Sequence, residues 1–108
     1  MNLKMPKTNG ILTILSRKPS VNAEQIMKVM PAEIRATVKL YLEGKIQQWF
    51  MQADGGGVIF ILNCKEVEEA RGIIEGLPFS TESLVDEQYI PIGPLLPLGI
   101  LLDDKKPE

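Results

Sequence analysis

No histidine occurs in this chain of 108 residues, and Cys64 is its only cysteine. Histidine is the side chain whose ordinary pKa best suits proton transfer near neutral pH, and it is the most common metal ligand. With one cysteine and no histidine, no metal-ligand spacing is present, so we expect neither a metal site nor a cofactor. A lone cysteine also excludes an internal disulfide, which is consistent with a reducing cytoplasm.

The chain also lacks a basic cluster and a long uninterrupted apolar run. Its 12 lysines and arginines are spread along the sequence and the net charge is −2, which argues against a nucleic-acid partner. The apolar run at residues 11–15 is too short for a secretory signal. The one at residues 90–102 is too short, and too interrupted by prolines, to span a membrane. We therefore expect a cytoplasmic protein.

The segment from Ile90 to Leu102 carries no charge, and Asp103-Asp104-Lys105-Lys106 follows it directly. A small domain rarely leaves so apolar a segment in water. It either folds back on its own core or lies across a neighbouring subunit, and the second reading is favoured because a domain of this size has little surface to cover it. We predict a lead-in at residues 1–9, a domain at 10–93, and an arm with a charged tail at 94–108.

The first helix has the clearest local signals. Asn22 and Gln25 have the spacing of a capping box, and Gly44 is placed to end the helix after Glu43. Pro31 predicts a kink or a break at the preceding residue. Apolar residues at helical spacing predict the buried stripe. This stripe consists of Ile26, Met30, Ile34, Val38, and Tyr41 or Leu42.

The order of apolar and glycine-rich segments predicts an α+β domain of the β-α-β-β-α-β, ferredoxin-like type. The strands at residues 11–15 and 58–62 are apolar at both odd and even positions. Because successive side chains of a strand point to opposite faces, both faces of the sheet should be buried. Helices can cover one face, and a second copy of the chain is the simplest cover for the other. The other predicted segments are a strand at 45–53, a glycine hairpin at 54–57, a helix at 66–75 and a strand at 85–92.

Three short motifs carry a family resemblance: Glu43-Gly44-Lys45, Val67-Glu68 and Leu77-Pro78-Phe79. Together they resemble the muconolactone isomerase-like group of the dimeric α/β barrel superfamily. The resemblance implies two ferredoxin-like sheets facing each other across a homodimer. It also implies higher assembly, commonly a decamer, in which a C-terminal segment reaches a neighbour.

The chain departs from those isomerases where their histidines lie, in the second strand and the hairpin. It has Gln47 and Gln48 and the glycines of residues 55–57 in that region. We therefore transfer the fold and the assembly from the resemblance, and no catalytic residue.

Trp49, with Tyr41, Gln48 and Tyr89, is the candidate lining of a pocket for a small organic molecule, because Trp and Tyr combine apolar area with one polar group. The alternative for the aromatic residues is ordinary core packing. The glutamines of the second strand either lie at an exposed edge, or pair across the dimer, or bind a ligand.

Proton transfer next to a carbonyl group needs a carboxylate in an apolar pocket. Glu87, between Val85 and Tyr89 in the last strand, is our candidate, and a surface carboxylate is the alternative. Two functions are consistent with these features of the sequence. One is a muconolactone isomerase-like homo-oligomer that binds a small molecule and transfers a proton. The other is a non-enzymatic binding or assembly module on the same scaffold, which the missing histidines favour.

Overall fold

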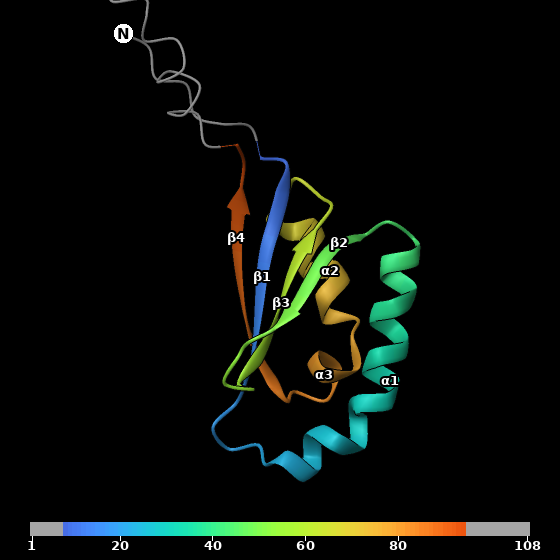
Figure 1. Ribbon diagram of the computed structural model, residues 1–108, viewed down its shortest axis with the longest axis vertical. Helices are drawn as coiled ribbons and strands as arrows, with labels where there is room; N and C mark the ends of the chain where they lie inside the picture. Colours follow the sequence, from blue (N-terminus) through green and yellow to red (C-terminus); the bar gives the residue numbers. More distant parts are fainter. Residues whose placement is uncertain (1–7, 95–108) are drawn as a thin grey trace, which may run out of the picture.

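The computed structural model describes residues 8–94, in which an antiparallel sheet carries all its helices on one face (Figure 1). The four strands lie in the order β2-β3-β1-β4. The elements are β1 (Gly10–Arg17), α1 (Ala23–Leu42), β2 (Ile46–Met51), β3 (Gly57–Leu62), α2 (Val67–Glu75), α3 (Pro78–Thr81) and β4 (Val85–Ile92). The predicted β-α-β-β-α-β order is confirmed, with the short helix α3 as an addition before β4, and the fold is ferredoxin-like. The predicted C-terminal arm, apart from Pro94, lies outside the described residues.

The predicted signals of α1 are confirmed at both ends. Asn22 Oδ1 accepts a hydrogen bond from the Gln25 N–H at 2.9 Å, and Gln25 Oε1 accepts one from the Asn22 N–H at 2.9 Å. Gly44 has a φ of +81°, a conformation that favours glycine. The helix is continuous, with Pro31 inside it. Figure 1 shows it bending within its first half, as expected where proline removes one hydrogen bond of the ladder.

The predicted buried stripe of α1 is wrong beyond Met30. Ile34 is 53% exposed and Val38 40%, whereas Glu33 and Thr37 are buried. The core side of α1 is the adjacent stripe, on which Val29, Ala36 and Leu40 are half-buried together with Ile26 and Met30. Both stripes contain apolar residues, so hydrophobicity does not distinguish them. The buried stripe tolerates a carboxylate because Glu33 accepts a hydrogen bond there.

Both faces of the sheet are apolar, as predicted. On the helix side, Ile11 and Leu15 of β1 and Phe60 of β3 are buried in the core. On the open side, Leu12 lies opposite Ile61, and Ile14 lies opposite Ile59. Within residues 8–94 no element covers this open side, which therefore presents a continuous apolar surface.

Candidate functional site

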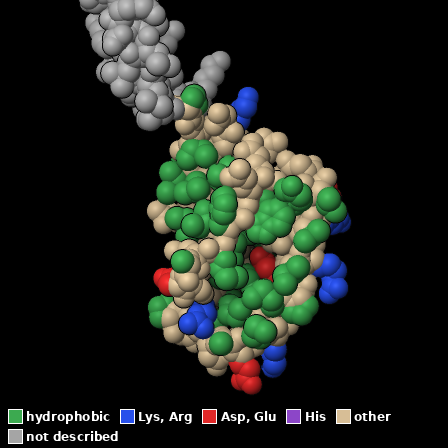
Figure 2. All heavy atoms as spheres, in the orientation of Figure 1, with side chains coloured by type: hydrophobic (Ala, Val, Ile, Leu, Met, Phe, Trp, Pro, Cys, Tyr) green, Lys and Arg blue, Asp and Glu red, His purple; other side chains and the backbone are tan. Residues whose placement is uncertain are grey.

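A cavity of about 190 Å³ lies where the C-terminal end of β1 meets the start of α1, the turn after β2, and α3. It is lined mainly by apolar groups, since Leu15, Ile26, Phe79 and Val85 form much of its wall. Figure 2 shows hydrophobic side chains gathered around one acidic side chain on the face that shows the edge of the sheet and α1. A largely apolar cavity with few polar groups is the usual form of a small-molecule site.

The glycines after β2 form one wall of this cavity. A Cβ atom on Gly57 would collide with the backbone carbonyl of Leu15 and would lie 2.6 Å from Gln52 Oε1. Only glycine allows this close approach of the turn to β1. Gly55, with a φ of +77°, supplies the left-handed conformation that the turn requires. The wall is therefore built from backbone.

Arg17 is the cationic residue of the cavity lining. It lies on the same side of β1 as Leu15, two residues away, and opposite Val85 of β4. Arg17 was not among the predicted site residues, because nothing in its neighbourhood along the chain indicates that the end of the strand borders a cavity.

Glu33 is a buried carboxylate that does not itself line the cavity but contacts the backbone of Phe79, a residue of the cavity wall. Its side chain, 5% exposed, points from α1 to α3, and Oε1 accepts a hydrogen bond from the Phe79 N–H at 2.9 Å. Burial raises the pKa of Glu33, and the hydrogen bond from Phe79 opposes part of that rise. Oε2 forms no hydrogen bond within residues 8–94.

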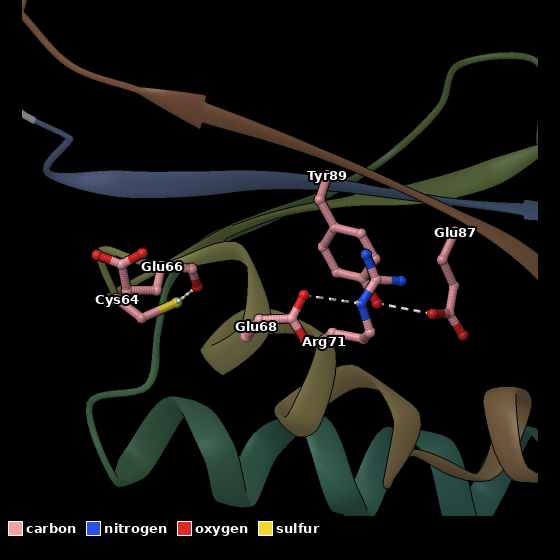
Figure 3. Close-up of polar contacts among 6 residues, drawn as sticks. All are labelled: Cys64, Glu66, Glu68, Arg71, Glu87 and Tyr89. Carbon is pink, nitrogen blue, oxygen red and sulfur yellow. Dashed lines mark hydrogen bonds and ion pairs between the residues drawn. The ribbon is translucent and has the colours of Figure 1, made fainter.

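Glu87 lies on the helix side of β4, opposite Leu15. Its Oε2 accepts a hydrogen bond from Ser80 Oγ at 2.6 Å, and its Oε1 accepts one from Tyr89 Oη at 2.6 Å. Figure 3 shows Tyr89 between Glu87 and Arg71, whose guanidinium carbon is 4.8 Å from the centre of the ring. Burial, and then the hydrogen bond to Glu87, raise the pKa of Tyr89, so its hydroxyl remains a donor at neutral pH.

The carboxylates of Glu33 and Glu87 both accept hydrogen bonds from α3. Glu33 from α1 holds the backbone of Phe79, and Glu87 from β4 holds the side chain of Ser80, the next residue of α3. Phe79 is part of the cavity wall. The position of that wall therefore depends on both carboxylates. Glu33 was missed as a site residue because its burial depends on contacts 46 residues away in the chain.

The predicted site residues fall into two groups. Tyr41, Gln48 and Trp49 lie together at the β2 edge, where the rings of Tyr41 and Trp49 meet edge to face with centroids 4.6 Å apart. Tyr41 is 47% exposed and Trp49 38%, so these two rings do not fill the core. Tyr89 and Glu87 lie on β4, at the opposite edge of the sheet. Gln47 and Gln48 are exposed on the edge strand β2, which corresponds to the first of the three alternatives for these glutamines, an exposed edge.

Neither Cys64 nor a cluster of metal-binding side chains contributes to the cavity within the described part of the chain. Cys64 is buried, and burial followed by the charge of Glu69 raises the pKa of its thiol, which disfavours a reactive thiolate. Within residues 8–94, no three metal-binding side chains come together. No helix in that part of the chain is long and apolar enough to cross a membrane.

None of the known protein-family models matches the chain, and no curated protein matches it. Among solved structures, the chain is similar to 5-chloro-2-hydroxyhydroquinone dehydrochlorinase from Burkholderia phenoliruptrix AC1100 in complex with 2,5-dihydroxybenzoquinone. The TM-score is 0.62 at 15% sequence identity, and the match covers 76% of this chain and 92% of that chain. This similarity supports the ferredoxin-like fold.

Proposed function

We propose that this protein is a homodimer that binds a small organic molecule in the cavity between its sheet and its helices. The observation that carries the proposal is an apolar cavity of about 190 Å³ whose wall is held by a buried carboxylate. The structural neighbour was solved with a one-ring compound, 2,5-dihydroxybenzoquinone, and a ring of that size is compatible with this cavity.

The homodimer forms through the open side of the sheet in this proposal. Leu12, Ile14, Ile59 and Ile61 form its centre, and burying such a surface is the main source of free energy for association. The resemblance to the muconolactone isomerases supports the same arrangement, and it also supports a further assembly in which the segment after Pro94 contacts a neighbour.

The chemistry we propose is proton transfer next to a carbonyl group, of the muconolactone isomerase type. Glu33 is the first candidate for the transferring group, because it is hydrogen-bonded to the backbone of Phe79 directly behind the cavity wall and burial raises its pKa. Glu87 is the second candidate, since it lies opposite Leu15 of the cavity wall, although both of its oxygens already accept hydrogen bonds.

A separate shallow surface at the β2 edge is formed by Tyr41, Gln48 and Trp49, and we propose it as a secondary contact site for a ligand or a neighbouring subunit.

Binding is tested by titration calorimetry with 2,5-dihydroxybenzoquinone and with muconolactone. Met27 and Lys28 are both exposed on α1, and of these two Met27 lines the cavity. Met27→Trp should weaken the binding of either probe, whereas Lys28→Trp should leave it unchanged. Absence of binding for both probes, or equal binding by the two variants, would contradict the proposed cavity site.

Turnover is tested separately, by following the absorbance of muconolactone. If Glu33 transfers the proton, Glu33→Gln should lower turnover by about 10²- to 10⁴-fold, the usual contribution of general acid–base catalysis. Loss in Glu87→Gln with turnover retained in Glu33→Gln would instead assign the transfer to Glu87. Binding without turnover in the wild type would favour the alternative, a non-enzymatic binding module, which the absence of histidine already supports.

A further inference from the structure

We propose that Arg17 makes this cavity select an anionic ligand over a neutral one, by binding the negatively charged group of a molecule with a single ring. The inference rests on the proposed function, because it concerns the same cavity and assigns the residue that determines its specificity for charge.

Arg17 lies at the border between the cavity and the solvent. The residue ends β1 on the helix side, next to Leu15 on that face, and it lines the cavity while remaining exposed. A guanidinium at that place borders both the apolar interior and the solvent. It can therefore bind a charged group at the mouth while the apolar part of a ligand lies inside.

The side chain of Arg17 is also available. Within residues 8–94 it forms no ion pair and no side-chain hydrogen bond, whereas Arg71 contacts both Glu68 and Tyr89. Asp54, the acidic residue of the neighbouring turn, accepts a hydrogen bond from the Gly56 N–H at 2.8 Å. An unpaired guanidinium has five N–H donors, and its planar fork matches the two oxygens of a carboxylate.

The volume of the cavity limits the size of the ligand. Apolar cavities of about 150 Å³ in proteins accept benzene, and this cavity measures about 190 Å³. It therefore accepts one six-membered ring with a small substituent. A second ring would have to remain outside.

The order of residues along β1 indicates how the ligand is oriented in the cavity. Leu15 is two residues from Arg17, which corresponds to about 7 Å along a strand. Leu15 lies opposite Glu87 of β4. A ring whose charged group contacts Arg17 therefore lies against Leu15 and Phe79, the level at which Glu33 and Glu87 reach α3. The opposite orientation would place the anion in the apolar part of the cavity and away from the guanidinium, which is electrostatically unfavourable.

The experiment compares benzoate with benzamide, which have nearly the same shape and differ in charge. Affinities are measured by NMR titration of the full-length protein. A charge-assisted hydrogen-bonded pair corresponds to about 10- to 100-fold in affinity, so wild-type protein should bind benzoate more tightly than benzamide by about that factor. Arg17→Gln should remove the preference, and Arg17→Lys should restore part of it because it keeps the charge without the planar fork.

Lys18→Gln is the matched control, since it removes the same charge one residue away from a side chain that does not line the cavity. It should retain the preference for benzoate. Equal binding of benzoate and benzamide by the wild type, or an unchanged preference in Arg17→Gln, overturns the inference while leaving the cavity as a binding site. If neither compound binds, and 2,5-dihydroxybenzoquinone and muconolactone do not bind either, the proposed function fails as well.

Discussion

Replacing Glu33 tests how much its buried carboxylate contributes to the stability of the fold. The side chain is 5% exposed, and its Oε1 accepts the Phe79 N–H at 2.9 Å. Glutamine keeps an acceptor oxygen at the same place and cannot ionise. Alanine removes the acceptor and leaves the Phe79 N–H without a partner. The two variants therefore separate the hydrogen bond from the charge.

The expected loss for Glu33→Ala follows from the unpaired donor. Leaving a buried donor unsatisfied costs about 1–3 kcal/mol of unfolding free energy. In a domain of about 100 residues, 1 kcal/mol corresponds to a change of roughly 4–8 °C in melting temperature. The alanine variant should therefore melt at least about 4 °C below the wild type, and the glutamine variant should be the more stable of the two.

The pH dependence has a definite sign. Burial raises the pKa of Glu33 above its ordinary value of 4.5. Between the ordinary pKa and the raised one, the folded chain holds a proton that the unfolded chain has released, so the stability of the wild type falls as the pH rises through that interval. Below pH 4.5 both states are protonated and this contribution is fully favourable. Glu33→Gln removes the contribution, and its stability should change less between pH 4.5 and neutrality.

Urea unfolding at fixed protein concentration, followed by the fluorescence of Trp49, measures these differences at each pH. Glu82→Gln is the control, because Glu82 is exposed and its side chain forms no hydrogen bond or ion pair within residues 8–94. Its pH profile should match that of the wild type. The reasoning is refuted if Glu33→Gln also has the wild-type profile, or if the alanine variant is as stable as the glutamine variant.

Three further predictions concern the sheet and the chain end. Ile14→Arg, at the centre of the open side, should convert the proposed homodimer into monomers in sedimentation experiments, and an unchanged mass would exclude this side as the interface. Gly57→Ala should destabilise the fold by about 1–3 kcal/mol or more, because its methyl group meets the Leu15 carbonyl. The control Gly72→Ala, in α2 with open space around it, should stabilise by about 0.5–1 kcal/mol, and similar denaturation midpoints for the two variants would contradict the steric argument. Deleting residues 94–108 should lower the oligomeric state or the solubility, and light scattering that gives the wild-type mass in a soluble protein would mean that the arm does not contact a neighbour.

Local sequence determined the order of the elements and the ends of α1. The capping box of Asn22 and Gln25, the bend at Pro31 and the stop at Gly44 depend on residues within about four positions, so each can be predicted from the sequence. The apolar character of both faces of β1 and β3 was equally readable, because the alternation of side chains is a property of any strand.

Tertiary structure alone decided which stripe of α1 is buried and which polar groups meet. Glu33 and Ile34 are neighbours in sequence, and the carboxylate is the buried one because α3, 46 residues further along, supplies a donor to it. In the same way, the strand order separates Tyr89 from Tyr41 and Trp49, although all three are aromatic residues of the same small domain. Burial depends on partners brought together by folding, and these partners are not encoded within the periodicity of any one segment.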